Sequence, residues 1–306
     1  MAHPPYLIRN YHPKDLNRFL EWVTKTEEQR HPWHPISVQD FLEILRLSHF
    51  PENNLFIAEQ AGHLVGYAGV RPEISIGRMV LSCFIELKHL RGGLFRKLIN
   101  PALGRSRELG GKVVQVNVFQ NRRTVRSLFE KMGFRAVRQF LELRLDLSNT
   151  HLTEIGKISP RCRSLKHDEE DKLLHLQNRS FAGAWGYNRN TRGDILHRLH
   201  LSRCSAGDVI AAFDRGEPVA YCWTRLDRRT KNDGRIYMLG VDPDYRGKGL
   251  GKKVLAAGLF YLKSKGARFV ELTVDSQNKV ARALYRSLGF RHHRSSLWYE
   301  KKLTGL

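Results

Sequence analysis

The sequence predicts an α/β fold made of two similar halves, for three reasons. An apolar strand from Ile236 to Val241 leads through a glycine-rich loop into a helix whose apolar residues follow the 3.6-residue period. A comparable order of strands, turns and helices occurs earlier in the chain. The length of 306 residues gives each half enough chain for a hydrophobic core of its own.

Matching features recur at nearly one offset, which indicates an internal duplication. The matched positions, 154 or 156 residues apart, are Gly62 with Gly216, Val118 with Val274, and Gly133-Phe134 with Gly289-Phe290. From Ser148 to Ser164, polar residues with a glycine and a proline replace the periodic pattern, as in a linker. We therefore predict one domain over residues 1–150 and a second over residues 151–306.

The composition is that of a globular protein, with 41% hydrophobic and 10% aromatic residues. No window approaches the roughly 18 apolar residues of a membrane helix, and the N-terminus lacks the apolar core of a secretory signal. Four cysteines form no C-x-x-C pair, which favours reduced thiols and a cytoplasmic location. His197 and His200 stand three residues apart, but no further ligand completes a metal site, so we expect none.

The excess of basic residues, a formal net charge of +22, predicts attraction to polyanions. A phosphorylated cofactor, RNA, the ribosome or a membrane surface would each be attracted. Lysine and arginine are dispersed along the chain without a basic tail, which favours an ordinary solvated surface. A nucleic-acid or ribosome partner stays open but is not favoured, and no membrane partner is expected.

The glycine-rich loop that follows Val241 has the composition of an anion site. Glycines at every second position let backbone N–H groups converge on a phosphate, and the positive end of the next helix lies behind them. Basic side chains add charge around the loop. We predict that a diphosphate contacts Arg246, Gly247, Lys248, Gly249, Leu250, Gly251 and Lys252.

The spacing of this loop indicates which diphosphate it binds. A Walker loop has four residues between its glycines and then Lys-Ser/Thr, and a dinucleotide loop reads G-x-G-x-x-G; neither matches G-x-G-x-G. The longer pattern V-x-P-x-x-R-G-x-G-x-G resembles the acyl-CoA pyrophosphate loop of the GNAT acetyltransferase superfamily. The resemblance implies an N-acetyltransferase that uses acetyl-CoA as co-substrate. It also implies a tandem pair of domains, each with a mixed, mostly antiparallel twisted sheet flanked by helices.

A second stretch, from Asn278 to Phe290, resembles the other GNAT signature, N-x-x-A-x-x-L-Y-x-x-x-G-F. The resemblance implies that Tyr285 is the general acid that protonates the departing thiolate. A tyrosine at the edge of the core is the alternative interpretation. The resemblance also places Asn278 near the pantetheine arm, although an asparagine at this position suits a helix N-cap equally well.

The strand before the loop supplies main-chain groups but no carboxylate. The implied fold would pair the pantetheine amides with this strand as with an added strand, through the main chain of Leu239, Gly240 and Val241. The N–H of Val241 is a candidate oxyanion donor. A general base would come from the next strand, where Glu271 and Asp275 could each act through a water, although a solvated strand face or a turn aspartate is the more ordinary interpretation of each. We prefer Asp275, and an acceptor amine of low pKa would need no base.

The acceptor site is predicted between two helical stretches of the second half. The segment from Asn178 to Asn188 is rich in aromatic residues and glycine, and it lies where acceptor loops lie in the resembling family. We predict that Trp185 and Tyr187 wall the acceptor pocket. A loop that its aromatic residues merely anchor would fit the pattern equally well.

The first half departs from the family pattern at the loop and at the acid. The stretch from Leu90 to Phe95 lacks one glycine and has Phe95 where a constant offset places Gly251. Phe129 stands where Tyr285 stands, so no hydroxyl is present. We predict that residues 1–150 form a degenerate, non-catalytic GNAT-like domain and that residues 151–306 form the catalytic one.

The predicted reaction is a direct attack of an acceptor amine on the acetyl thioester. A cysteinyl conjugate of the mycothiol type is one candidate acceptor, and another small amine is equally compatible with the sequence. One alternative acceptor is a protein N-terminus or a lysine side chain. A different class of function, a basic RNA- or ribosome-binding protein with a vestigial CoA site, is disfavoured because the second glycine loop is complete.

Overall fold

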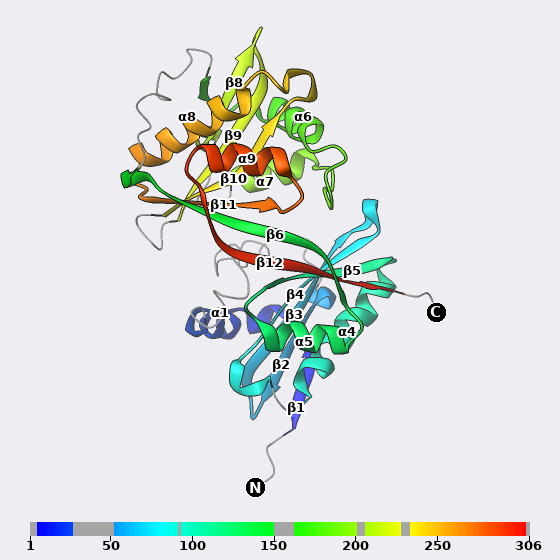
Figure 1. Ribbon diagram of the computed structural model, residues 1–306. Helices are drawn as coiled ribbons and strands as arrows, with labels where there is room; N and C mark the ends of the chain where they lie inside the picture. The colour runs from blue at the N-terminus through cyan, green and yellow to red at the C-terminus, as the bar shows by residue number, and fades with distance from the viewer. Residues whose placement is uncertain are drawn as a thin grey trace. The chain divides into compact units, whose positions relative to one another are not determined.

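The computed structural model describes residues 5–26, 52–90, 93–149, 162–200, 206–227 and 233–303. A helix that the periodicity predicts from Asp40 to Leu47 lies outside these ranges. The chain forms two compact units: unit 1 comprises Met1–Gln139 and Ser295–Leu306, and unit 2 comprises Phe140–Arg294. Each unit combines one sheet with several helices (Figure 1), so the predicted α/β class is confirmed.

Unit 1 contains a mixed sheet with the strand order β1-β2-β3-β4-β5-β12. Its strands are β1 (Tyr6–Asn10), β2 (Leu55–Gln60), β3 (His63–Glu73), β4 (Arg78–Ile85), β5 (Val113–Phe119) and the final part of β12 (Arg291–Lys302). Its helices are α1 (Leu16–Lys25), α4 (Leu94–Glu108) and α5 (Arg123–Lys131). Only β4 and β5 run parallel, and the other neighbouring pairs are antiparallel.

Unit 2 repeats this plan with the strand order β6-β11-β10-β9-β8-β7. Its strands are the final part of β6 (Arg135–Asp146), then β7 (Cys162–Ser164), β8 (Val209–Asp214), β9 (Glu217–Asp227), β10 (Asp233–Val241) and β11 (Phe269–Asp275). Its helices are α6 (Glu170–Ser180), α7 (Arg192–His200), α8 (Leu250–Ser264) and α9 (Lys279–Ser287). Here β10 and β11 are the parallel pair.

Each unit takes its last strand from the other half of the sequence. Residues 140–146 of β6 pair with β11 in unit 2, and residues 296–302 of β12 pair with β5 in unit 1. The compact units therefore do not coincide with the two halves of the chain. The division at residue 150 stays a prediction about the repeated sequence.

The same ion pair occurs at the start of both copies, 154 residues apart. In unit 1, Arg9 binds Asp15 at 2.7 Å, and the carboxylate also accepts from the N–H of His12. In unit 2, Arg163 binds Glu169 at 2.6 Å, and that carboxylate accepts from the N–H of Lys166. This repeated contact agrees with the duplication that the sequence predicts.

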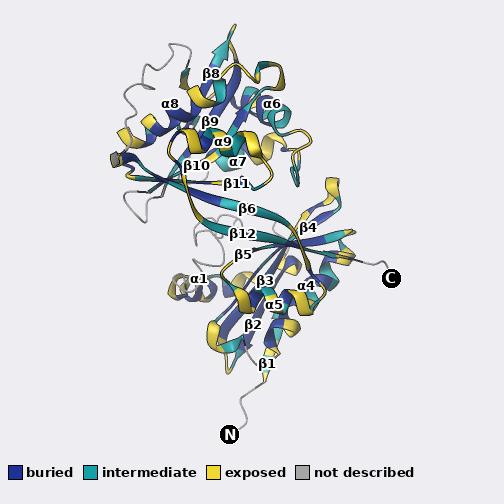
Figure 2. Cartoon of the chain, viewed as in Figure 1, coloured by how far each residue is buried: buried dark blue, intermediate teal, exposed yellow. Residues whose placement is uncertain are grey.

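Two groups of helices cover opposite faces of the unit 2 sheet. Alternation along β9 directs Cys222 toward α8 and Tyr221 and Trp223 toward α6 and α7. Helix α8 packs closely because Gly258 has no side chain: a Cβ there would lie 2.5 Å from the Cys222 sulfur. Residues 218–224 of β9, which alternate between the two faces, are accordingly all buried, and this strand is mostly dark blue in Figure 2.

The parallel pair in unit 2 is hydrogen-bonded only at its beginning. The β10–β11 ladder runs from Asp233 to Ile236 and then stops, although β10 continues to Val241. A register shift between Ile236 and Met238 marks a β-bulge at that point. Beyond the bulge β10 is laddered only to β9 among the described strands, so its other edge presents main-chain groups. The β4–β5 ladder in unit 1 is similarly short.

Candidate active site

The glycine-rich loop lies between β10 and α8, as the sequence predicts. A short 3-10 turn, η8 (Pro243–Tyr245), follows β10, and Gly247 and Gly249 adopt φ values of +76° and +73°. These left-handed conformations strain any residue with a side chain, which explains the two glycines. Helix α8 begins at Leu250, and no side chain among the described residues caps it. Its first N–H groups are therefore available to an anion.

Two of the predicted cations have contacts within unit 2. Arg246 donates to the carbonyl oxygen of Ser180 at 2.8 Å. Lys248 donates to the carbonyl oxygen of Asp244 at 3.2 Å, and its ammonium lies 4.7 Å from the centre of the Tyr245 ring. Both contacts are exposed, and so is Lys252. None of the three is buried, so each side chain can reorient toward a phosphate.

The end of β10 provides the edge that the predicted pantetheine contacts need. Leu239, Gly240 and Val241 pair with β9 on one side, and the ladder to β11 has already stopped on the other. Gly240 permits a close approach of α6, since a Cβ there would lie 2.4 Å from the Tyr221 ring and 3.0 Å from Ser180. Whether a ligand binds to this edge stays a prediction.

Tyr285 lies on α9 with its side chain in the core of unit 2. It is 7% exposed and meets Phe290 edge to face at 5.8 Å. Burial raises the pKa of its phenol well above the ordinary value, so the hydroxyl is protonated at neutral pH. No described residue forms a hydrogen bond with this hydroxyl, which can therefore donate to a ligand.

The polar residues flanking Tyr285 have structural contacts. Asn278 caps α9, because its Oδ1 accepts from the N–H of Ala281 at 3.0 Å. Its N-cap interpretation is confirmed, and its contact with CoA stays a prediction. Asp275 ends β11, and its Oδ1 accepts from the N–H of Gln277 at 2.9 Å. Its role as a general base also stays a prediction.

Glu271, the other candidate base, belongs to a network of ion pairs. Arg144 lies 3.4 Å from its carboxylate, and Arg294 lies 3.8 Å from it. Arg294 also binds Glu142 on the neighbouring strand. These contacts place Glu271 in a structural ion-pair network, and its role as a base stays a prediction.

The predicted acceptor segment forms an ordered loop between α6 and α7. Tyr187 donates from its hydroxyl to Oδ1 of Asn178 at 2.7 Å and stacks on Phe181 at 5.5 Å. Trp185 contacts Phe140, with ring centres 5.9 Å apart. Both aromatic residues are thus half-buried and anchored on one side. Their contact with an acceptor stays a prediction.

Sequence reasoning missed a buried polar group beneath this loop. Several buried side-chain atoms on α6 and β9 have no hydrogen-bond partner among the described residues: both amide atoms of Gln177, the hydroxyls of Ser180 and Tyr221, and Nε1 of Trp223. Gln177, Tyr221 and Trp223 are fully buried. Buried polar atoms without a hydrogen-bond partner are uncommon in native proteins and often indicate a bound water or a functional group. No motif in the sequence signals this cluster, because its members come from separate elements.

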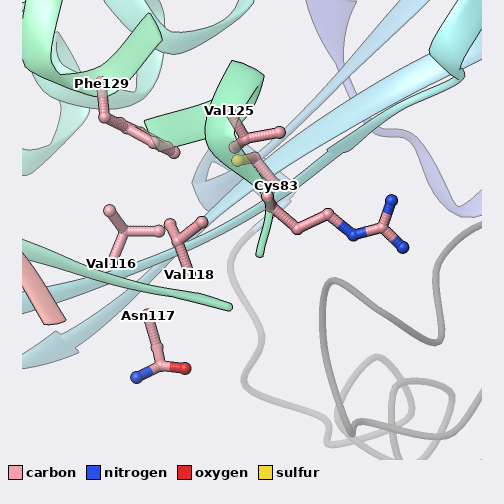
Figure 3. A pocket seen from close by; sticks show the side chains of 7 residues that line it. Cys83, Val116, Asn117, Val118, Val125 and Phe129 are labelled. Atoms are coloured by element: carbon pink, nitrogen blue, oxygen red, sulfur yellow. The ribbon is translucent and has the colours of Figure 1, made fainter. Parts of the chain in front are cut away.

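Unit 1 fills the corresponding place with aromatic rings. Phe95 in the first turn of α4 meets Phe129 of α5 edge to face at 4.9 Å, and Phe129 meets Phe134 at 5.0 Å. A small hollow remains beside Phe129 (Figure 3), between β4, β5 and α5. Cys83 and Arg122 also line it, and burial raises the pKa of the Cys83 thiol to about 12.

The described part of the chain contains no cluster of three or more metal-ligating side chains. His197 lies on α7, and the side chain of His200 is outside the described residues. Among the described helices, none is both long enough and apolar enough to cross a membrane.

Three features occur together in unit 2: a parallel pair, β10 and β11, whose ladder stops at Ile236, a glycine loop at a helix N-terminus, and a buried tyrosine. Together they define an acyltransferase of the GNAT type. Comparison with protein families agrees with this class. The model of the acetyltransferase (GNAT) family matches residues 16–134 and again residues 171–290. The chain belongs to this family, carries its domain twice and is an N-acetyltransferase.

Curated relatives cover most of the chain. A mycothiol acetyltransferase of Clavibacter sepedonicus is 29% identical over 262 residues, which span 84% of this chain and 80% of the relative. A mycothiol acetyltransferase of Clavibacter michiganensis subsp. michiganensis is 30% identical over 216 residues, which span 69% and 68%. The tandem architecture that the sequence predicts is thus confirmed.

Solved structures share the fold over nearly the whole chain. A GCN5-related N-acetyltransferase from Sphaerobacter thermophilus matches with a TM-score of 0.72 at 18% identity and covers 99% of this chain and 98% of its own. A tandem GNAT protein from the clavulanic acid biosynthesis pathway matches with a TM-score of 0.73 at 14% identity, with coverage of 97% and 98%. At these identities the likeness supports the fold alone.

Proposed function

We propose that this protein is an acetyl-CoA-dependent N-acetyltransferase that acts on a small-molecule amine in unit 2. One observation carries the proposal. The loop from Arg246 to Gly251 combines left-handed glycines with the uncapped N-terminus of α8, beside an edge of β10 that lacks a β11 partner. A diphosphate and an amide-containing arm fit these two features together.

In this proposal the loop binds the diphosphate of acetyl-CoA and β10 orients the thioester. The first N–H groups of α8 and the charges of Arg246, Lys248 and Lys252 hold the phosphates. Main-chain groups of Leu239 to Val241 align the arm, and the N–H of Val241 donates to the thioester carbonyl as negative charge develops. No metal is required, because these donors supply the electrostatic stabilisation.

Tyr285 is the proposed general acid. Because burial raises the pKa of its phenol, the group stays protonated and can donate a hydrogen bond to the departing sulfur. The proton follows as the carbon–sulfur bond breaks and the thiolate, of ordinary pKa near 8.5, would otherwise form. Asp275 is the proposed base and would act through a water on the acceptor ammonium.

The relatives inform the acceptor class. Several are mycothiol acetyltransferases, so a cysteinyl conjugate of the mycothiol type is the first acceptor to test, and other small amines follow. We propose that the loop bearing Trp185 and Tyr187 contacts this acceptor. Unit 1 is the proposed non-catalytic copy, since Phe95 and Phe129 occupy its equivalent site.

A panel of amines tests the proposal. Each amine is incubated with the protein and acetyl-CoA, and free thiol release is measured. We expect turnover with at least one small amine and none with the Gly249→Trp variant, whose loop cannot keep its left-handed conformation. A thermal shift with CoA should occur in the native protein and be lost in the variant. Turnover of peptides but of no small amine would contradict the acceptor class.

A further inference from the structure

The last turn of α6 contacts both of the loops that the proposed reaction requires. Asn178, Arg179 and Ser180 are consecutive residues of this turn. Asn178 binds the segment from Phe181 to Asn190, which is the proposed acceptor loop. Arg179 and Ser180 bind the segment from Asp242 to Arg246, which leads into the glycines of the proposed CoA loop.

Arg179 connects α6 to the start of the CoA loop through two carboxylates. Its Nε lies 2.7 Å from Asp242 Oδ2, and its terminal nitrogen lies 3.0 Å from Asp242 Oδ1 and 2.8 Å from Asp244 Oδ2. The hydrogen bond with Arg179 lowers the pKa of Asp242, whose side chain is only 13% exposed. A bidentate contact of this kind fixes direction as well as distance.

A second connection runs in the opposite direction, from the CoA loop to α6. Arg246, the first residue of the predicted phosphate site, donates to the carbonyl oxygen of Ser180 at 2.8 Å. Asp242 also accepts from the N–H of Asp244 at 3.0 Å, so the residues that bind Arg179 are ordered among themselves. The loop is thus held to α6 at both ends of the 3-10 turn.

Asn178 holds the acceptor loop closed. Its Oδ1 accepts from the N–H of Asn190 at 2.9 Å and from the hydroxyl of Tyr187 at 2.7 Å, and its Nδ2 donates to the carbonyl of Asn190 at 3.0 Å. Asn190 in turn donates from its side chain to the Tyr187 hydroxyl at 2.8 Å. All the partners of the Asn178 amide in these contacts belong to the acceptor loop.

The geometry points to a coupling function for this turn. We infer that the last turn of α6 transmits binding of CoA to the acceptor loop and that Arg179 is the positioning residue. The inference rests on the proposed function. A bound diphosphate would immobilise Asp242 to Arg246, and Arg179 would pass this restraint along one hydrogen-bonded turn to Asn178. Because coupling is reciprocal, the acceptor would bind more tightly to the CoA complex, and CoA would bind more tightly to the acceptor complex.

Hydrogen exchange with CoA, which lacks the acetyl group and cannot react, tests this inference. Amide exchange is measured in the full chain with and without CoA, for peptides covering residues 178–190 and 242–252. In the native protein we expect CoA to slow exchange in both segments. In Arg179→Ala we expect slowing at 242–252 only, together with CoA binding that is roughly fivefold weaker, the lower end of usual coupling.

Two further variants separate coupling from general damage. Arg192→Ala removes an exposed ion pair to Asp171 on the same pair of helices, without a contact to the CoA loop, and should exchange like the native protein. Arg179→Lys keeps the charge but cannot hold both carboxylates. In this variant CoA should slow exchange at 178–190 more than in Arg179→Ala and less than in the native protein.

Equal slowing at 178–190 in the native protein and in Arg179→Ala would overturn the inference, and so would no slowing there in the native protein. If CoA slowed exchange in neither segment, the proposed CoA site itself would be wrong and the coupling would fall with it. In the native protein, slower exchange at 242–252 without slower exchange at 178–190 would contradict the coupling but not the proposed CoA site.

Discussion

The first turns of α4 and α8 are the same place in two copies of one fold, and they differ in what occupies them. In unit 1, Phe95 projects from this turn and packs against Phe129. In unit 2, the turn has Gly251, and Tyr285 stands at the position of Phe129. A Cβ on Gly251 would touch Leu284 and Val241 at 3.5 Å, which is ordinary contact. The glycine therefore does not relieve a backbone clash, and in the proposed function its missing side chain is what leaves space for CoA.

The contrast is local, because the surrounding scaffold is retained. Both units have a short parallel ladder, a helix after a glycine loop, and the repeated arginine–carboxylate pair of Arg9 with Asp15 and Arg163 with Glu169. Retention of these contacts in both copies shows that they serve the fold. We infer that activity depends on a few positions around the loop, whose residues the fold itself does not require.

Transfer of the unit 1 residue into unit 2 is the strongest test of this comparison. Gly251→Phe should fill the space over the first turn of α8 and weaken CoA binding by roughly 100-fold, about 2.7 kcal/mol. Titration calorimetry with CoA measures the change. Gly251→Ala is the matched control, since its Cβ makes only ordinary contacts, and it should bind CoA within a few-fold of the native protein. Native-like CoA binding by Gly251→Phe would contradict the proposal that the residue at this position sets the difference in CoA binding between the two units.

Removal of the phenol tests the second difference. Tyr285→Phe should lower kcat by roughly 100-fold with little change in CoA affinity, since general acid catalysis contributes about 10²–10⁴-fold. Because the pKa of Tyr285 is raised, ionisation of this group should cause no loss of native activity below about pH 10. Thiol release and CoA titration separate the two parameters.

Tyr299→Phe is the control for that experiment. This unit 1 phenol is also buried, and its hydroxyl bonds to Glu130 and Arg126. Its removal should change stability but leave kcat unchanged. Equal losses of kcat and CoA affinity in Tyr285→Phe would exclude the acid role.

Local motifs predicted the parts of the site that are continuous in sequence. The strand before the loop, the glycines and α9 all follow one another within about fifty residues, and each has its own pattern. The N-cap role of Asn278 was also predictable from residue type. These elements depend on short-range preferences, which sequence periodicity records.

Contacts between distant elements were not predictable in the same way. The exchanged strands 140–146 and 296–302 have ordinary strand patterns, and nothing in such a pattern names the partner strand. The contact of Arg179 with Asp242 joins residues 63 positions apart. In a chain with 52 lysine and arginine residues, no charge pattern singles out this pair.

The orphaned polar cluster of unit 2 gives a third comparison. Gln177 is fully buried and neither of its amide atoms has a partner within the described part of the chain, so Gln177→Met should stabilise the protein by about 1–2 kcal/mol. In unit 1 the buried Gln115 accepts from Arg78 and donates to Glu300, so Gln115→Met should destabilise it by a similar amount. Urea unfolding measures whether each substitution raises or lowers the free energy of unfolding. Destabilisation by Gln177→Met would mean that its amide has partners, such as bound waters, in solution.

The repeated ion pair predicts a small dependence of stability on pH in both copies, and in unit 1 Asp15 also binds Arg18 and Arg9 also binds Glu59. Hydrogen bonds from Arg9 and Arg163 lower the pKa values of Asp15 and Glu169, each to about 2. A carboxylate whose pKa is lowered on folding stabilises the protein above its unfolded pKa, near 4, and this stabilisation is lost as pH falls toward 2.

Because both arginines are partly exposed, we expect only about 1 kcal/mol from each pair at neutral pH. Arg9→Ala and Arg163→Ala should each remove that amount at pH 7 and much less near pH 2, as measured by urea unfolding. A loss at pH 7 in only one variant would show that the duplicated contact no longer serves both copies equally, and a loss independent of pH would assign it to packing of the arginine stems instead of charge.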